Sequence, residues 1–193
     1  MRQIAIFASG SGSNFEAIAL AAQTGVLNAK ISLLVCDRPN AYVITRAERL
    51  GIPAFSFSPS QYAGKAAYET AILEQLHTRN VTFIALAGYM RIVGETLLRA
   101  YPNQIVNIHP SKLPDFPGKD AIARAYESGA PETGVSVHYV DAGIDTGPVI
   151  AQRTVEIAQT DTLESLTEKV HQVEHVLYIE TLKRILETEE VTK

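Results

Sequence analysis

Short runs of apolar and β-branched residues alternate along this chain with longer stretches that have helical periodicity. Such an alternation is typical of a mostly parallel sheet covered by helices, because each crossover between parallel strands needs a long connection. The run at 83–87 is continuously apolar, as expected of a central strand buried on both faces. We expect strands at 4–8, 31–36, 55–57, 83–87, 105–108, 135–140 and 148–155, and helices at 14–23, 41–50, 62–76 and 162–186.

The order of these elements predicts an α/β fold with a mostly parallel, Rossmann-like sheet, helices on both faces and an antiparallel C-terminal strand region. We expect residues 1–193 to form a single domain, since no repeat or linker interrupts a chain of this length. In open sheets of this kind, ligands bind at the carboxyl ends of the strands. The Glu-rich segment 187–190 is expected to fray.

Charge and composition narrow the choice of partner. The formal net charge is -4 without any basic block, which disfavours nucleic acid because affinity for it rests on Lys and Arg. A small anionic ligand is still compatible, since backbone N–H groups can bind phosphate. The single cysteine, Cys36, excludes an internal disulfide, and the first apolar run is too short for a signal sequence or a membrane span. We therefore expect a cytoplasmic protein that does not bind membranes.

A Gly-Ser loop at residues 9–14, with the sequence Ser-Gly-Ser-Gly-Ser-Asn, directly follows the first predicted strand and opens a helix. Its glycines permit a tight turn, and the helix N-terminus presents N–H groups to an anion. A Rossmann dinucleotide loop would need a third glycine where Phe15 stands, and the Gly-Lys-Ser/Thr sequence of a P-loop is absent. The loop therefore favours a monophosphate, with a simple strand-to-helix turn as the alternative.

Asn107 and His109 stand at the end of the strand predicted at 105–108. Strand alternation puts the two side chains on the same side of the sheet. An amide and an imidazole that converge on one point can polarise a carbonyl group. The alternative is a polar pair that is satisfied at the strand end and has no function.

The loop at 141–148 lies between two predicted strands and contains two carboxylates, two glycines and a proline. This composition usually makes a turn, and a turn is the default interpretation for Asp141. Asp145 is a functional candidate if the fold brings it beside His109. In that position it would orient the imidazole and raise its pKa.

Other histidines and the cysteine have mainly structural interpretations. His171 and His175 are four residues apart on the last predicted helix, a spacing that can bind zinc, but no third ligand is evident and we expect no metal. His138 lies in an alternating strand and is either a core residue or a residue that lines the site. Cys36 is expected to be buried rather than nucleophilic.

Four segments, in this order and spacing, resemble the folate-dependent formyltransferase family, in particular the phosphoribosylglycinamide (GAR) formyltransferases of purine synthesis. They are 8–14, 86–92, 107–111 with the following Leu113-Pro114, and 134–150. The resemblance covers nearly the whole chain. It implies GAR as the acceptor, 10-formyltetrahydrofolate as co-substrate, no metal, and a monomer or homodimer.

The resemblance also implies roles for individual residues. It implies a phosphate-binding half at about 1–100 and a folate-binding and catalytic half at about 101–193. The implied catalytic residues are Asn107, His109 and Asp145. The implied GAR-binding residues are Ser11, Gly12, Ser13 and Asn14, largely through backbone amides, with Gly88, Pro110 and Glu174, of which Glu174 holds the sugar hydroxyls. The implied folate-binding residues are Lys65, near the folate tail, and Leu86, Met90, Arg91, Ile92, Val93, Leu98, Ile105, Val140, Asp141 and Asp145.

The implied reaction is a direct transfer through a tetrahedral oxyanion. Asn107 and protonated His109 would stabilise the oxyanion, and Asp145 would assist proton transfer. Two related enzymes are alternatives on the same catalytic domain: a methionyl-tRNA formyltransferase, which needs an additional tRNA-binding domain, and a formyltetrahydrofolate hydrolase, which usually adds a regulatory domain. A non-catalytic sensor of phosphorylated ligands and an oxidoreductase with a degenerate Rossmann loop are alternatives from other classes.

Overall fold

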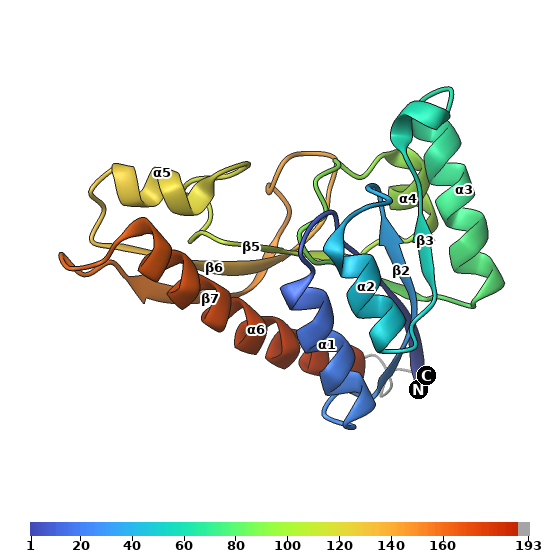
Figure 1. The fold of residues 1–193 in the computed structure, drawn as a ribbon, viewed down its shortest axis with the longest axis horizontal. Helices are drawn as coiled ribbons and strands as arrows, with labels where there is room; N and C mark the ends of the chain where they lie inside the picture. The colour runs from blue at the N-terminus through green and yellow to red at the C-terminus, as the bar shows by residue number, and fades with distance from the viewer. Residues whose placement is uncertain (189–193) are drawn as a thin grey trace.

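A computed structural model describes residues 1–188 as a seven-stranded sheet with helices on both faces (Figure 1). The strand order is β3-β2-β1-β4-β5-β6-β7, and β1 to β5 are parallel whereas β6 and β7 pair antiparallel. The strands are β1 (Arg2–Phe7), β2 (Ala29–Cys36), β3 (Ala54–Ser56), β4 (Phe83–Leu86), β5 (Ile105–His109), β6 (Glu132–Tyr139) and β7 (Val149–Glu156). The predicted fold class is therefore confirmed, including the antiparallel strands near the C-terminal end.

The helices form a layer on each side of the sheet. They are α1 (Ser13–Gln23), α2 (Tyr42–Arg49), α3 (Lys65–Thr78), α4 (Glu95–Ala100), α5 (Ala121–Glu127) and α6 (Leu163–Thr188). One apolar cluster contains side chains of α1, α2 and α6 with α5 packed against it, and a second cluster contains side chains of α3 and α4. Figure 1 shows α6 running along the sheet from β6 and β7 to α1, which it contacts.

The core is divided by the sheet, and β1 shows how. Ile4 and Ile6 belong to the cluster under α1 and α6, whereas Ala5 and Phe7 belong to the cluster under α3 and α4. All four side chains are fully buried. Because successive side chains of a strand point to opposite faces, a strand covered on both sides must be apolar throughout.

Three helical segments differ from the prediction. The helix expected at 62–76 begins at Lys65, because a short 3-10 helix, η1 (Pro59–Gln61), and an extended Tyr62 precede it. Two further helices, α4 and α5, have no counterpart among the predicted elements. These helices contain 6 and 7 residues, too few for a helical period to stand out.

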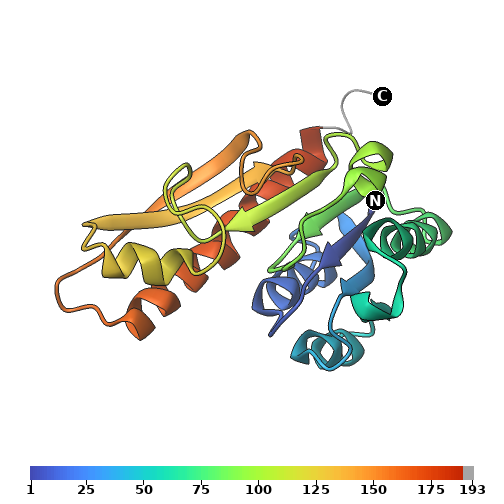
Figure 2. The ribbon, with the colours of Figure 1, turned by 90° about the horizontal axis from the view of Figure 1, so that it is seen from above.

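The chain changes direction across the sheet between β1 and β4. From β1 it moves outward to β2 and β3, and it then returns to the other side of β1 to form β4 and β5. Figure 2 shows the two halves of the chain side by side, with the green strands between them. The loops after β1 and β4 meet at this point, where Ser9 donates its N–H to the carbonyl of Gly88 at 3.0 Å. Such a switch point is where open α/β sheets bind ligands.

The described part of the chain ends inside the segment expected to fray. Glu187 and Thr188 belong to α6, and the rest of that segment lies outside the described residues. Between residues 1 and 188, we find no helix whose length and apolar character would let it cross a bilayer.

Candidate active site

The Gly-Ser loop at 9–14 joins β1 to α1, and its shape depends on Gly12. Gly12 has φ +79°, in the left-handed region that favours glycine, and a Cβ atom there would lie 2.6 Å from the Cβ atom of Val43. The Gly12 carbonyl accepts the N–H of Glu16 at 2.9 Å. The N–H groups that follow belong to the first turn of α1, and such groups bind anions.

Arg46 of α2 places a positive charge behind this loop. Its Nε donates to the Ser11 carbonyl at 2.8 Å, and its guanidinium also pairs with Glu16. The side chain is 19% exposed, so the charge is partly shielded from water. Arg46 is not among the residues predicted for the site, because only the packing of α2 beside α1 brings it to the loop.

Glu174 of α6 lies against the same loop. Asn14 donates a hydrogen bond to its carboxylate, and His171 Nε2 lies 3.8 Å from Glu174 Oε2. Burial raises the pKa of Glu174 to about 7, although the hydrogen bond from Asn14 acts in the opposite direction. Asn14 Oδ1 is buried and has no hydrogen-bond partner among residues 1–188. Two buried acceptors therefore lie near the loop, an arrangement that suits the hydroxyl groups of a ligand.

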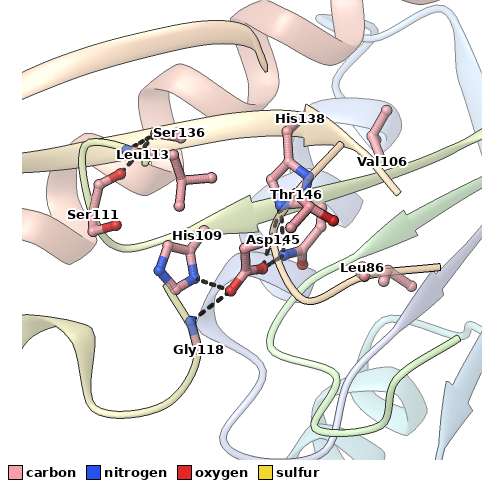
Figure 3. Close-up of polar contacts among 12 residues, drawn as sticks. Leu86, Val106, His109, Ser111, Leu113, Gly118, Ser136, His138, Asp145 and Thr146 are labelled. Atoms are coloured by element: carbon pink, nitrogen blue, oxygen red, sulfur yellow. Dashed lines mark hydrogen bonds and ion pairs between the residues drawn. The ribbon is translucent and has the colours of Figure 1, made fainter. Parts of the chain in front are cut away.

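Asn107, His109 and Asp145 lie together at the end of β5. Asp145 Oδ2 is 3.3 Å from His109 Nδ1, and Asp145 Oδ1 accepts a hydrogen bond from Asn107 Nδ2 at 3.3 Å. Figure 3 shows the imidazole of His109 facing the carboxylate of Asp145. Asn107 and His109 contact Asp145 from the same side of β5, as strand alternation predicts. Asp145 is a functional candidate only if the fold brings it beside His109, and the structure places it there.

His138 of β6 completes this cluster from the neighbouring strand. It is the register partner of Asn107 in the antiparallel β5–β6 pair. Its Nε2 lies 3.2 Å from Asn107 Nδ2 and 3.4 Å from Asp145 Oδ1, while its Nδ1 donates to the Tyr139 carbonyl at 2.8 Å. Nε2 accepts from Asn107 when the ring is neutral and donates to Asp145 when the ring is protonated. Strand alternation allowed His138 to line the site, but only the register puts it opposite Asn107.

Burial decides the charge of His109. It lowers the pKa of the imidazole, whereas the contact with the Phe116 carbonyl and the charge of Asp145 raise that pKa by less. Asp145 thus acts in the direction predicted for it, and the net lowering of the pKa comes from burial, which outweighs the effect of Asp145. Nε2 of His109 donates to the Phe116 carbonyl at 2.9 Å, so the neutral ring presents an unprotonated Nδ1 to Asp145.

Asp145 keeps its negative charge in this partly buried position. Burial by itself would raise the pKa of the carboxyl group. The hydrogen bonds from His138 and from the Gly118 N–H, the latter at 2.8 Å, and the charges of His109 and His138 together lower that pKa below its ordinary value. An ionised Asp145 therefore faces both imidazoles at neutral pH.

The loop at 141–148 holds Asp145 in an unfavourable backbone conformation. Asp145 has φ +54°, a region that residues other than glycine rarely adopt. Asp141 Oδ1 accepts the Gly143 N–H at 3.0 Å and the Thr146 hydroxyl at 2.7 Å, which closes the loop from within. A Cβ atom at Gly147 would overlap the carbonyl oxygen of Tyr139. Asp141 thus stabilises the turn that the composition of this loop predicts, and the turn places the Asp145 side chain beside His109.

The segment after β5 starts with the half-buried Pro110 and returns to the site with Gly118. Ser136 of β6 anchors it, because its hydroxyl donates to the Ser111 carbonyl at 2.7 Å and accepts the Leu113 N–H at 3.0 Å (Figure 3). No local pattern in the sequence signals the role of Gly118. A cleft of about 330 Å³ opens beside Asp145 and is lined by Leu113, Pro114, Pro117, Ile144, Asp145, Thr146, Gly147 and Val149.

Most apolar residues predicted for the folate pocket gather near the ends of β4 and β5. Leu86, Val93 and Ile105 are buried in one cluster, and Leu98 and Val140 pack against it. The Val140 N–H also donates to the Ile105 carbonyl at 2.9 Å. The fold therefore brings these five residues together from β4, β5, α4 and the connecting segments.

The segment at 88–94 carries the remaining candidates for folate binding. Met90 and Ile92 are 54% and 51% exposed, and neighbouring exposed apolar side chains are typical of a ligand-facing surface. Arg91 pairs through Nε with Asp37 at 2.8 Å. Lys65, the first residue of α3, lies against this segment, since a Cβ atom at Gly94 would be 2.7 Å from Lys65 Cε.

The histidine pair on α6 is not part of a metal centre in the described structure. His171 is exposed, and His175 Nε2 is buried without a hydrogen-bond partner within residues 1–188. In the same part of the chain, no three His, Cys, Asp or Glu side chains are grouped so that they could hold a metal ion.

Comparison with known proteins gives similarity over almost the entire chain. Residues 2–182 match the formyl transferase family. The chain is 52% identical over 186 residues to the phosphoribosylglycinamide formyltransferase of Bacillus subtilis (strain 168), covering 96% of this chain and 95% of that protein. It is 35% identical over 176 residues to the trifunctional purine biosynthetic protein adenosine-3 of Drosophila melanogaster, covering 90% of this chain and 13% of that protein. The crystal structure of glycinamide ribonucleotide transformylase 1 from Geobacillus kaustophilus has a TM-score of 0.94 and 60% identity, covering 96% of this chain and 99% of that one.

Proposed function

The chain belongs to the formyl transferase family, and from that premise we propose that it transfers the formyl group of 10-formyltetrahydrofolate to the amine of GAR. The products are formyl-GAR and tetrahydrofolate, in the de novo synthesis of IMP. The observation that carries the proposal is the contact of Asn107, His109 and Asp145 at the end of β5. A donor, a titratable base and a carboxylate at one point are what acyl transfer to an amine requires.

The two substrates occupy neighbouring parts of the switch point. The phosphate of GAR binds the backbone N–H groups at 11–14, with the charge of Arg46 behind them. Its sugar hydroxyls donate to Glu174 and to Asn14 Oδ1, the two buried acceptors. The folate lies along the segment at 88–94 and the apolar residues behind it, with its N10 atom directed at Asp145. This placement brings the GAR amine and the formyl carbon into one site, which removes the entropic cost of an encounter.

The reaction forms one C–N bond and breaks another. The GAR nitrogen attacks the formyl carbon, and the formyl oxygen becomes an oxyanion that accepts a hydrogen bond from Asn107 and, once His109 Nδ1 carries a proton, one from His109. The proton lost by the amine passes to His109 Nδ1, either directly or through water held by Asp145, and then to N10 of the folate as the C–N10 bond breaks. Neutral His109 can accept this proton, and Asp145 then stabilises the imidazolium ion.

The first test is turnover with purified protein, GAR and 10-formyltetrahydrofolate, followed by absorbance of the folate product. We expect product formation that depends on GAR. Asn107→Ala, His109→Ala and Asp145→Asn should each lower kcat by about 10²–10³, with small changes in KM, because each removes a group that acts in the transition state. The matched control is His77→Ala, an exposed histidine on α3, which should keep the activity of the unchanged protein.

The alternatives predict different results in the same assay. Folate turnover without GAR would identify a hydrolase, and tight GAR binding without turnover would identify a sensor. If a folded protein carrying all three substitutions kept near-normal turnover, the assignment of these residues would be wrong.

The cytoplasm is the location that we propose for this reaction. The only cysteine, Cys36, is a buried free thiol, which is compatible with a reducing compartment. Fractionation of cells that produce the chain, with activity measured in each fraction, tests this location.

A further inference from the structure

Asp37 is a buried carboxylate to which the proposed reaction assigns no role. It follows β2 directly, and its side chain is 1% exposed. Oδ1 accepts a hydrogen bond from the Ser9 hydroxyl, and Oδ2 accepts one from Arg91 Nε at 2.8 Å. A buried charge is costly unless such partners compensate it, so this arrangement needs an explanation.

The partners of Asp37 belong to the two substrate segments. Ser9 begins the phosphate loop at 9–14, and Arg91 lies in the middle of the folate segment at 88–94. The Ser9 hydroxyl also accepts the Met90 N–H at 2.8 Å, and the Ser9 N–H donates to the Gly88 carbonyl at 3.0 Å. One carboxylate therefore joins loops that follow three neighbouring strands, β2, β1 and β4.

We propose that Asp37 is a positioning residue that couples the GAR site to the folate site through Ser9 and Arg91. This inference rests on the proposed function, since it takes its two substrates from there. One carboxylate oxygen of Asp37 binds Ser9 in the phosphate loop, and the other binds Arg91 in the folate segment. A shift of either segment would therefore break its hydrogen bond to Asp37. The coupling predicts that a change at Asp37 alters the binding of both substrates, although it touches the loop residues and not the reacting atoms.

Asp37→Asn tests the proposal with little change of shape. The amide has an NH2 group in place of one carboxylate oxygen, so the hydrogen bond that this oxygen accepts, from Ser9 or from Arg91, is lost. We expect the KM values for GAR and for 10-formyltetrahydrofolate to rise together by about tenfold, the effect of one lost charge-assisted hydrogen bond. The kcat at saturation should stay within about threefold, because Asn107, His109 and Asp145 keep their contacts.

Asp161→Asn is the matched control. Asp161 also accepts hydrogen bonds, from Lys169 Nζ at 2.6 Å and from the Ala158 N–H at 2.8 Å, but it stands before α6 and outside both substrate segments. It should leave both KM values unchanged. If Asp37→Asn folds and changes neither KM, or changes only one of them, the proposed coupling is wrong.

Hydrogen exchange separates this inference from the proposed function. In Asp37→Asn, the amides of 9–14 and of 88–94 should exchange faster together, with the Met90 N–H among them, whereas Asp161→Asn should leave both segments protected. This measurement needs no substrate, so it tests the role of Asp37 even if the unchanged protein lacks GAR-dependent turnover.

Ser9→Ala is the second variant, for use if Asp37→Asn does not fold, because it removes only the hydroxyl between Asp37 and Met90. The same joint loss of protection is expected, and protection that stays intact in either segment would overturn the proposal.

Discussion

His109 and Glu174 are both buried titratable residues of the site, and burial moves their pKa values in opposite directions. It lowers the pKa of the imidazole and raises the pKa of the carboxyl group, in both cases because the charged form loses contact with water. His109 is therefore neutral near pH 7 and can accept a proton. Glu174 is partly protonated at the same pH, because its pKa is about 7.

At the residue scale, the raised pKa of Glu174 predicts a pH-dependent stability. The folded protein binds a proton at Glu174 up to a pKa of about 7, whereas the unfolded chain releases it near 4.5. The folded state thus loses stability as the pH rises from 4.5 through 7. In Glu174→Gln this loss is absent, so the free energy of unfolding of the variant should gain up to about 3 kcal/mol relative to the unchanged protein between pH 4.5 and 8.

Urea unfolding of both proteins at several pH values measures this gain. The matched control is Glu180→Gln on the same helix, where the exposed carboxylate pairs with Arg153. The difference in stability between that control and the unchanged protein should vary little with pH. Stability curves for Glu174→Gln and the unchanged protein that run parallel from pH 4.5 to 8 would contradict the assignment of the raised pKa.

At the element scale, the turn between β1 and α1 depends on one of its two glycines. Gly12 combines a left-handed φ with the close approach of Val43, whereas a Cβ atom at Gly10 would meet no atom within 4 Å. Both glycines looked alike as parts of a Gly-Ser loop. The packing of α2 against the turn makes only Gly12 indispensable.

Gly12→Ala should therefore distort the phosphate loop. We expect a loss of stability of about 2 kcal/mol or more, since a left-handed alanine costs about 1–2 kcal/mol before the overlap with Val43 is counted. The KM for GAR should rise as the N–H groups of α1 leave their positions. Denaturant unfolding and substrate titration measure the two effects.

Gly10→Ala is the control for the effect on stability, and it should change the free energy of unfolding by less than about 1 kcal/mol. If both alanine variants were equally stable, the close approach of Val43 would not explain why the turn needs a glycine at position 12.

At the scale of the whole molecule, one apolar cluster joins the two halves of the chain. It contains Phe15 of α1, Val137 of β6 and Tyr178 of α6. The Tyr178 hydroxyl donates to the Leu86 carbonyl at 2.8 Å, at the end of β4. We propose that residues 1–188 unfold as one unit, because neither half can keep this cluster buried alone.

Leu182→Ala tests this proposal. Leu182 is fully buried in the shared cluster, so its truncation should lower the free energy of unfolding by about 2–5 kcal/mol. Hydrogen exchange should show β2 and β6 losing protection to the same extent. Leu163→Ala, at the exposed start of α6, should cost less than about 1 kcal/mol. Loss of protection in β6 alone would mean that the halves are separate domains.

Four properties follow from the amino-acid sequence alone: the α/β class, the succession of the main strands along the chain, the family, and the placement of Asn107 and His109 on one side of a strand. These properties depend on local periodicity and on the spacing of residues along the chain, which can be read without a structure. The short helices α4 and α5 could not be predicted, because they contain too few residues for a helical period to be recognised.

Packing in three dimensions sets which residues far apart in sequence come together. His138 joins the site through its register opposite Asn107, Gly118 through the anchored return of a loop, and Asp37 through the neighbourhood of β2, β1 and β4. It also decided the direction of the His109 pKa shift, because burial and the charge of Asp145 oppose each other and only the packed structure sets their balance. Contacts between residues far apart in sequence, and the water that packing excludes, leave no periodic signal in the chain.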